Sequence, residues 1–332
     1  MRFQRPSFFS RARRHLLAAA ALGLCAALPL QASAQEWPTR AIRIIVPYTP
    51  GGGNDIMARI IAEKLAPALG QPVVVENRAG AGAIVGTEYV INSDPDGYVL
   101  LFAASGPMVF NQALIPNLSY NTLKDLAPIT MAGRFPLVLA VKEDFVARNF
   151  NELVDFSKKN PDKSNYSYPA ASFQLGMELL KARTGLQALN VPYKGSAPSI
   201  NAVLSGDVQM TFVDIGPAAA MLKAGRLRGI AVTSKERLEA YPEIPTLIEQ
   251  GVDFTITLWS GLFASAKTPE HIINRLYQEV AKIVAMPDVK ERFAKFDITA
   301  ESMPPTEFRQ LIADEIALWT QVAKDNNLQE QR

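Results

Sequence analysis

The sequence predicts an α/β protein in which strands alternate with helices around mostly parallel sheets. Short β-branched or apolar runs alternate with segments whose apolar residues recur at helical spacing. Gly-rich or Gly/Pro turns separate the runs from these segments. Because successive strand–loop–helix units place helices on the faces of a parallel sheet, we expect helices on both sides of the sheet.

The first units follow one another in the N-terminal third of the chain. Strands are expected at residues 42–46, 73–75 and 98–103. Helices are expected at residues 55–69 and 83–92. Gly70-Gln71-Pro72 stops the first helix, and Asp94-Pro95-Asp96-Gly97 forms a turn before the third strand.

The middle of the chain repeats the pattern, and the last part is mostly helical. Strands are expected at residues 137–141, 166–168, 189–191, 208–213 and 228–232, and extended segments at 254–258 and 261–264. Helices are expected at residues 151–160, 172–184, 197–205 and 217–223. One apolar stripe should pack in the core and consists of Phe308, Leu311, Ile312, Ile316, Trp319 and Val322. Since no low-complexity linker separates the two sets of units, we expect two α/β lobes joined by crossing strands.

The N-terminus has the pattern of a secretory signal peptide that is cleaved near Ala34. Five arginines and no acid precede an apolar run from Leu16 to Leu30, and Ala32-Ser33-Ala34 supplies the small residues of a cleavage site. The run is short for a stable membrane anchor. Adjacent Arg13 and Arg14 leave both general and twin-arginine export open. The expected location is therefore the periplasm.

Removal of residues 1–34 changes which functions the composition allows. It lowers the basic side chains from 34 to 29 against 32 acidic ones, a formal charge of −3, and it removes the single Cys. A nucleic-acid binder is disfavoured, because phosphate contacts need a basic surface. His271, the one histidine left, is expected in the first turn of a helix, so neither a Ser-His-Asp triad nor a zinc site is expected. We expect no enzyme activity, no metal and no cofactor.

Three turns after the N-terminal strands are candidates for holding an anion. The first is Tyr48-Thr49-Pro50-Gly51-Gly52-Gly53-Asn54, the second contains Gly80-Ala81-Gly82-Ala83, and the third contains Ser105-Gly106. Glycines let backbone amides approach a ligand, and a helix N-terminus offers unpaired N–H groups with partial positive charge. Asp55 or Asn54 is expected to cap the first helix. Because ligands bind beyond the carboxyl ends of strands in open α/β sheets, the three turns should converge on one small anion.

A dinucleotide enzyme is the rival interpretation of the same glycines. Gly80, Gly82 and Gly86 approximate a dinucleotide-binding fingerprint. The motif follows the second strand, however, and no acid ends the next strand, where a ribose partner would belong. An NAD(P)-dependent dehydrogenase is therefore disfavoured.

The middle lobe has turns of the same kind. Tyr193-Lys194-Gly195-Ser196 links a strand to a helix, and Asp214 ends another strand. Lys194 either meets the anion or is a solvated surface residue. Asp214 either accepts a hydrogen bond from a ligand, caps a helix or holds the hinge. Trp259 lies either in the core or in the wall of a cleft.

An ordered set of segments gives the chain a resemblance to a known family. "VPYTPGGGND", "ENRAGAGAIVG", "DPDGYVLLFA", "NVPYKGSAPSINAVLSGDVQMTFVD", "GRLRGIAVTSKERLEAYPEIPTLIEQG" and "WSGLFASAKTP" occur in this order. The chain resembles the Bug family of extracytoplasmic solute-binding proteins, the TctC-like receptors of tripartite tricarboxylate transporters. The resemblance implies a two-lobed class II periplasmic-binding-protein (Venus flytrap) fold and delivery of a carboxylate to a permease of one large and one small subunit.

The resemblance also implies where the ligand and the lobes lie. The ligand would contact Tyr48 to Asn54, Gly80 to Ala83, Ala104 and Ser105 in the first lobe, and Ala171, Ser172, Phe173, Gln174, Tyr193 to Ser196 and Asp214 in the second. Lobe 1 would comprise residues 35–135 plus 256–332, and lobe 2 residues 136–255. The protein is expected to be a monomer.

The chain departs from the family where a Gly/Ser-rich turn is usually followed by His-Leu. Gln174 stands at the usual histidine, and Phe173 precedes it. The Phe173 ring either packs inward or lines the cleft, and in the second case it would favour an aromatic carboxylate. Tricarboxylates, C4 or longer dicarboxylates, acidic amino acids and aromatic acids all remain open as ligands, and an exported signalling receptor of the same fold remains open as the function.

Overall fold

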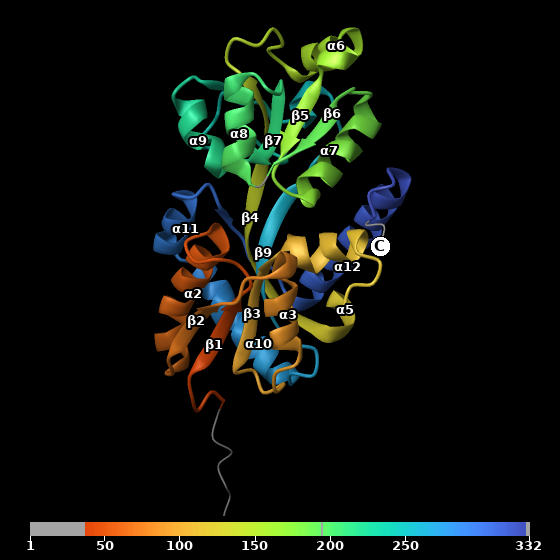
Figure 1. Cartoon of the computed structure of the whole chain (residues 1–332). Coiled ribbons are helices and arrows are strands. Elements are labelled where there is room, and N and C mark those ends of the chain that lie inside the picture. The colour runs from red at the N-terminus through yellow and green to blue at the C-terminus, as the bar shows by residue number, and fades with distance from the viewer. Residues whose placement is uncertain (1–36, 194, 330–332) are drawn as a thin grey trace, which may run out of the picture. The chain divides into compact units, whose positions relative to one another are not determined.

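The computed structural model describes residues 37–193 and 195–329 (Figure 1). The expected signal segment, its cleavage at Ala34, and Lys194 lie outside the described residues. The described residues from Arg40 onward form one compact unit. Within the described residues, no helix combines the length and the apolar character needed to cross a membrane.

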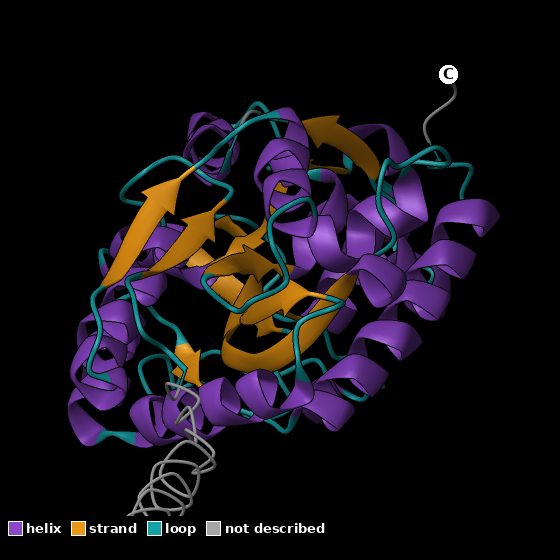
Figure 2. Ribbon diagram, turned by 90° about the horizontal axis from the view of Figure 1, so that it is seen from below, coloured by secondary structure: helices purple, strands orange, loops and turns teal. Residues whose placement is uncertain are grey.

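The strands form one continuous mixed sheet with helices on its faces (Figure 2). The strand order is β2-β1-β3-β9-β4-β7-β5-β6, and β8 and β10 pair with β4 off this path. The strands are β1 (Ile42–Val46), β2 (Val73–Asn77), β3 (Val99–Ala104), β4 (Leu126–Lys142), β5 (Asn165–Tyr168), β6 (Leu189–Pro192), β7 (Met210–Asp214), β8 (Leu227–Val232), β9 (Thr257–Ser265) and β10 (Thr299–Ala300). The prediction of an α/β fold with flanking helices is confirmed.

The helices follow the strands as the sequence predicts. The helices are α2 (Gly53–Leu69), α3 (Ile84–Ile91), α4 (Asn111–Leu114), α5 (Thr122–Asp125), α6 (Phe150–Lys159), α7 (Ala171–Thr184), α8 (Ser196–Ser205), α9 (Ile215–Lys223), α10 (Glu270–Ala285), α11 (Pro287–Ala294) and α12 (Pro305–Asp325). Short turns of other helical types cover Ala81–Ala83, Gly106–Phe110, Pro161–Lys163 and Ile248–Gln250. Gly70 ends α2 in the left-handed conformation, with φ 67°, which glycine adopts without steric cost.

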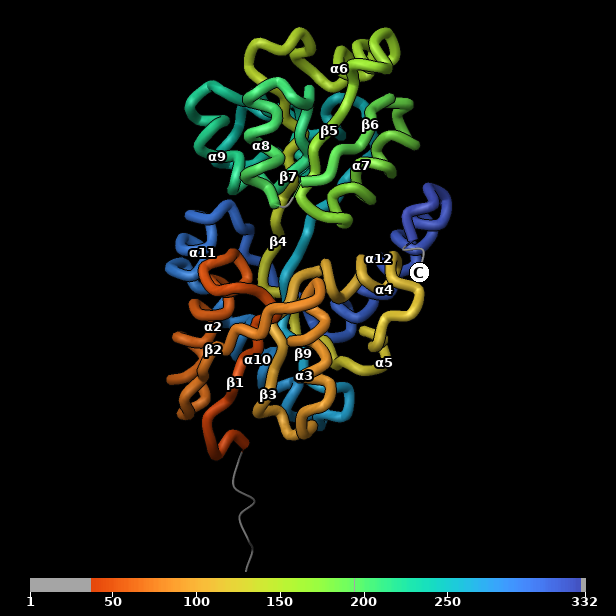
Figure 3. The backbone as a smooth tube through the Cα atoms, in the orientation of Figure 1, coloured from red at the N-terminus to blue at the C-terminus, as the bar shows by residue number. Residues whose placement is uncertain are grey.

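The two groups of parallel strands lie on opposite sides of β4 in the strand order. β1 pairs in parallel with β2 and β3, and β5 pairs in parallel with β6 and β7. The first part of β4 pairs antiparallel with β9, and its second part pairs antiparallel with β7 and β8. We call the β1–β3 group with its helices the first lobe and the β5–β7 group with its helices the second lobe. Figures 1 and 3 show β4 and β9 side by side, leading from one group to the other.

The core is continuous between these groups of elements. Phe263 and Trp259 of β9 pack against Phe308 of α12, with ring centroids 4.9 Å apart for Trp259 and Phe308. Trp259 is fully buried, so it belongs to the core rather than to a cleft wall. The C-terminal stripe packs as expected. Phe308, Ile312, Trp319 and Val322 are buried, and Leu311 and Ile316 pack against the core while partly exposed.

Candidate ligand-binding site

The register of the strands brings the ends of the two lobes' parallel strands close together along β4. Ala104, the last residue of β3, pairs with Ser260, which pairs with Gly133 of β4. Asp214, the last residue of β7, pairs with Leu137 of β4. Since a strand rises about 3.3 Å per residue, the two carboxyl ends lie about 13 Å apart along β4. The turns that follow the parallel strands of both lobes therefore converge on one short stretch.

Helices begin at these turns without a side-chain cap. The N-cap residues of α2, α3, α7, α8 and α9 make no capping hydrogen bond with their own side chains. By contrast, Asn121 caps α5 and Asn149 caps α6, each with its side-chain oxygen. The helices α10, α11 and α12 also lack a side-chain cap, so this feature alone does not mark a site. Together with the convergence of the strand ends, it leaves several backbone N–H groups available to an anion.

The turn after β2 has a strained backbone. Ala81 and Ala83 have φ of 46° and 73°, and Gly80 and Gly82 between and before them also have positive φ. For a residue with a Cβ atom this left-handed conformation costs roughly 1–2 kcal/mol. Such strain tends to occur at functional sites, where the surrounding structure enforces it. The strain therefore falls within the predicted anion-binding turn.

Tyr48 connects the first of the predicted turns with the third. Its hydroxyl oxygen accepts a hydrogen bond from the backbone N–H of Ala104 at 3.3 Å. Burial raises the pKa of this phenol far above its usual value, so it stays neutral. Asn54 makes a further link, because its Oδ1 accepts a hydrogen bond from Ser260 Oγ at 2.6 Å.

Ser105 places a hydroxyl at the end of β3. Its side chain is 1% exposed, and within the described part of the chain its Oγ makes no hydrogen bond. A buried hydroxyl without a partner costs on the order of 1–3 kcal/mol. A polar group placed against Ser105 would remove that cost.

Asp214 places a carboxyl group at the end of β7. Its Oδ2 accepts a hydrogen bond from Ser196 Oγ at 3.4 Å, and its side chain makes no capping bond to α9. Burial raises the pKa of this carboxyl to about 6, against the smaller opposing effect of the Ser196 hydroxyl. The capping alternative for Asp214 is therefore not observed.

The turn that precedes α7 completes the second lobe's contribution. α7 begins at Ala171 and packs against α12 and against the turn at Gly106–Phe110. Ala171 is exposed, and Ser172 and Gln174 are partly exposed. Phe173 is 5% exposed and belongs to the main core cluster. Its ring therefore takes the inward-packed alternative rather than the exposed position that a cleft wall would require.

Comparison with known proteins decides the family. A profile described as "Tripartite tricarboxylate transporter family receptor" (TctC) matches residues 57–328. The chain belongs to the TctC family. BugT of Bordetella pertussis is 35% identical over 297 residues, covering 88% of this chain and 91% of BugT. The UPF0065 protein in the tcbD-tcbE intergenic region of Pseudomonas sp. strain P51 is 32% identical over 327 residues, covering 97% of each chain.

Solved structures agree with this assignment. MatC from Rhodopseudomonas palustris with bound malate has a TM-score of 0.72 at 28% identity, covering 86% of this chain and 99% of MatC. The periplasmic binding protein BugD has a TM-score of 0.73 at 29% identity, covering 89% of this chain and all of BugD. An R. palustris protein with adipate has a TM-score of 0.76 at 29% identity, covering 87% and 98% of the two chains. The chain is therefore a solute-binding protein of the TctC family, whose members are periplasmic receptors.

The structure brings most of the predicted TctC site residues to the converging turns. Those of the first lobe lie at or after the ends of β1, β2 and β3. Those of the second lobe lie in the first turn of α7, between β6 and the start of α8, and at the end of β7. Pro50, Gly51 and Gly52 are exposed, and Gly53 and Asn54 are partly exposed. Tyr193, Gly195 and Ser196 are partly exposed in the turn between β6 and α8. No group of three or more His, Cys, Asp or Glu side chains among the described residues is arranged to hold a metal.

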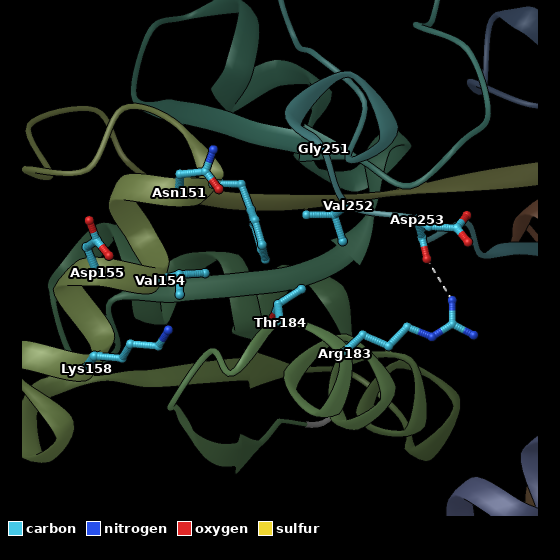
Figure 4. Close-up of a pocket in the computed structure, with 10 residues that line it drawn as sticks. Asn151, Val154, Asp155, Lys158, Arg183, Thr184, Gly251, Val252 and Asp253 are labelled. Carbon is cyan, nitrogen blue, oxygen red and sulfur yellow. Dashed lines mark hydrogen bonds between the residues drawn. The ribbon is translucent and has the colours of Figure 1, made fainter.

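One pocket of the described chain lies away from these turns (Figure 4). It lies between α6, the end of α7 and residues 251–253. Arg183 Nη1 donates to the carbonyl oxygen of Asp253 at 2.8 Å across this pocket. None of the predicted TctC site residues lines it.

Sequence reasoning missed some residues of the converging turns. Ser260 and Asn77 both bond to the first of the turns. Asn77 stands two residues after a run of three valines, so the sequence indicates its position near the end of a strand. Ser260 had no such signal, because its contact with Asn54 depends on β9 passing the start of α2.

Proposed function

We propose that this chain captures a small carboxylate between its two lobes and delivers it to the permease of a tripartite tricarboxylate transporter. The single observation that carries the proposal is the convergence of uncapped helix N-termini from both lobes on residues 133–137 of β4. The malate and adipate in neighbouring structures are small carboxylates of the kind these donors would hold. In this proposal the protein carries out no chemical reaction on its ligand.

The first lobe would hold one carboxylate group through backbone donors. The contributing residues would be Tyr48, Pro50, Gly51, Gly52, Gly53, Asn54, Gly80, Ala81, Gly82, Ala83, Ala104 and Ser105. Uncapped N–H groups and the helix dipole favour an anion without a nearby free cation. The buried hydroxyl of Ser105 would gain its missing partner from the ligand or from a water molecule bound to it.

The second lobe would contact the rest of the ligand and so stabilise the closed form of the protein. The contributing residues would be Ala171, Ser172, Gln174, Tyr193, Lys194, Gly195, Ser196 and Asp214. Contacts from both lobes exist together only in the closed form, so a ligand that makes them shifts the population towards closure. The expected lobe boundaries are residues 35–135 plus 256–332 against 136–255. They would put the hinge within β4 and just before β9, and we retain them as part of this proposal.

Export and assembly belong to the same proposal. A signal peptide cleaved near Ala34 would place the protein in the periplasm as a monomer. The permease would consist of one large and one small membrane subunit, which the ligand-loaded receptor contacts.

Thermal unfolding of the purified protein with adipate, malate, citrate, benzoate and NAD tests the proposal. An acid present at about 100 times its dissociation constant should stabilise the protein by about 2.7 kcal/mol. A stabilising shift with at least one acid and none with NAD is the expected result. A shift with NAD alone, or no shift with any acid, would contradict the proposed function.

A further inference from the structure

A buried carboxylate lies directly behind the first of the converging turns. Asp55 is 3% exposed and stands in the first turn of α2. Its Oδ2 accepts hydrogen bonds from the backbone N–H of Gly51 at 2.9 Å and from Arg59 Nε at 3.0 Å. Its Oδ1 accepts from Asn77 Nδ2 at 2.9 Å and contacts Arg59 Nη2 at 3.0 Å. Asp55 was expected to cap α2, but the N-cap residue is Gly52, and the Asp55 side chain instead reaches back to Gly51 in the turn that precedes the helix.

Asn77 connects the same carboxylate to a second strand. It is the last residue of β2, and its Nδ2 also donates to the carbonyl oxygen of Tyr48 at 3.1 Å. Its Oδ1 accepts from Arg59 Nη2 at 3.0 Å. The three side chains of Asp55, Arg59 and Asn77 thus bond to one another, and together they bond to both ends of the Tyr48–Gly51 segment.

The charge of this cluster is balanced internally. Burial acts to raise the pKa of Asp55, but hydrogen bonds from Arg59, Gly51 and Asn77 outweigh it, and the net effect lowers the pKa. Arg59 supplies the compensating positive charge. An ionised carboxylate can therefore stand beside an anion-binding turn without a net negative charge that would repel the ligand.

The position of the cluster fixes which backbone donors are free. The N–H of Gly51 is already used by Asp55, while the first helical bond of α2 starts at the N–H of Ile56, which donates to Gly52. The donors that remain for a ligand come from the residues between them. Their direction depends on the Gly51 bond, because Gly51 has φ of 85° and Gly52 has an extended conformation.

We propose that Asp55, Arg59 and Asn77 form a positioning unit for ligand binding, which aims the N–H groups at the start of α2 and fixes the turn after β1 to the turn after β2. This inference rests on the proposed function, and it assigns a task to residues that do not touch the ligand. A charge-assisted hydrogen bond is shorter and stronger than a neutral one, so the cluster holds the turn in one geometry before the ligand arrives.

Two variants and a matched control test the positioning unit. Asp55→Asn keeps the shape of the side chain but replaces one carboxylate oxygen, which faces two N–H donors, with an NH2 group that cannot accept from them. Asn77→Ala removes the connection to β2 and leaves Asp55 in contact with Gly51 and Arg59. Glu63→Gln is the control, because Glu63 lies on the same helix and pairs with Arg292 at 3.0 and 3.1 Å, away from the turns. Calorimetric titration at 20 °C with the acids that stabilise the wild-type protein gives the dissociation constants.

The expected result is a loss of affinity of about tenfold in both variants and none in the control. The loss should be the same factor for every acid that binds, because the unit acts on the shared carboxylate. Amide ¹⁵N–¹H spectra without ligand supply a readout that a loss of stability alone would not move. In Asp55→Asn the signals of residues 81–83, in the other turn, should shift, and in Glu63→Gln they should not.

Each outcome bears on a separate claim. Unchanged affinity in Asn77→Ala, measured on folded protein, would overturn the positioning unit while the wild type still binds acids. Failure of Asp55→Asn to fold would leave Asn77→Ala to decide by the same measurement. Failure of the wild-type protein to bind any acid would overturn the proposed function and this inference together.

Discussion

Glu315 gives the protein a pH-dependent stability that can be worked out from its surroundings. This residue lies on α12, and its Oε2 accepts a hydrogen bond from Trp259 Nε1 at 2.8 Å. Trp259 pairs with Arg134 across β9 and β4. Burial raises the pKa of Glu315 to about 7, and the Trp259 hydrogen bond and the charge of Arg134 only partly oppose it.

The raised pKa fixes the sign and the size of the effect. Between pH 4.5 and about 7 the folded protein keeps Glu315 protonated, whereas the unfolded chain ionises it. The free energy of unfolding therefore falls as the pH rises through this window and is flat above it. One pKa unit corresponds to about 1.4 kcal/mol, so the full shift corresponds to roughly 3 kcal/mol. Partial exposure of the side chain reduces the expected effect to about 1–2 kcal/mol.

Glu315→Gln removes this ionisation and keeps an acceptor for the indole N–H. Urea unfolding followed by far-UV circular dichroism at pH 5 and pH 8 measures the effect, because comparison of the two proteins cancels the other titrating groups. The variant should lose about 1–2 kcal/mol less stability than the wild type between these pH values. Glu291→Gln, at an exposed position, is the control. Equal pH dependence in wild type and Glu315→Gln would refute the reasoning.

Three further changes probe the proposed ligand turns. Burial raises the pKa of Asp214 to about 6, so this carboxyl is largely neutral at pH 5 and ionised at pH 8, where it repels an anionic ligand. The ligand should therefore bind more weakly at pH 8 than at pH 5, and Asp214→Asn should abolish that difference in titration calorimetry. An unchanged pH dependence in the variant would contradict this role of Asp214. A Cβ atom at Gly86 would lie 2.7 Å from Pro47 Cβ, which is closer than van der Waals contact allows. Gly86→Ala should therefore lower the free energy of unfolding, measured in urea, by roughly 1–3 kcal/mol. An unchanged free energy of unfolding would show that the backbone around Pro47 moves to accommodate the methyl group. Tyr48→Phe removes the acceptor of the Ala104 N–H and should lower the free energy of unfolding in urea by about 0.5–1.5 kcal/mol. An unchanged free energy of unfolding would mean that a water molecule replaces the hydroxyl as acceptor.

The order of strands, turns and helices could be predicted from the sequence because each element has a local signal. The β-branched runs, the glycines after them and the helical periodicity all depend on neighbouring residues. For the same reason the expected bounds are close to those of β1, α2 and α7. His271 likewise lies in the first turn of α10, as predicted from Thr268-Pro269-Glu270.

The full length of β4 could not be predicted in this way. Only residues 137–141 were expected as a strand, whereas β4 spans Leu126–Lys142. Pro128 and Pro136 argue against a central strand, since proline cannot donate to the ladder. The structure places Pro128 beside a register shift, and Pro136 where the partner changes from β9 to β7. Long-range pairing, which no local pattern encodes, therefore overrides the local signal.

The position of Phe173 illustrates a signal that was present in the sequence. Phe173, Met177 and Leu180 recur at helical spacing, and all three are buried on one face of α7. Gln174, one position round the helix, is partly exposed. Periodicity thus favours an inward ring, whereas the departure from the family pattern at this turn favours a ring that lines the cleft. The strain at Ala81 and Ala83 had no comparable signal beyond the glycines beside them.

The basic side chains beside the first-lobe turns form ion pairs with acidic side chains of the protein. For this reason the amino-acid composition and net charge do not indicate which ligand binds. Arg59 is paired with Asp55, and the Arg78 guanidinium pairs with Glu76 at 2.6 Å. The basic side chains next to the two turns are therefore occupied by the protein's own carboxylates. In the first lobe, attraction for an anion then comes from backbone N–H groups, whose strength depends on direction rather than on net charge. A site built in this way depends on the hydrogen bonds that hold its turns in place. Side chains that do not contact the ligand therefore contribute to the affinity of the protein for it.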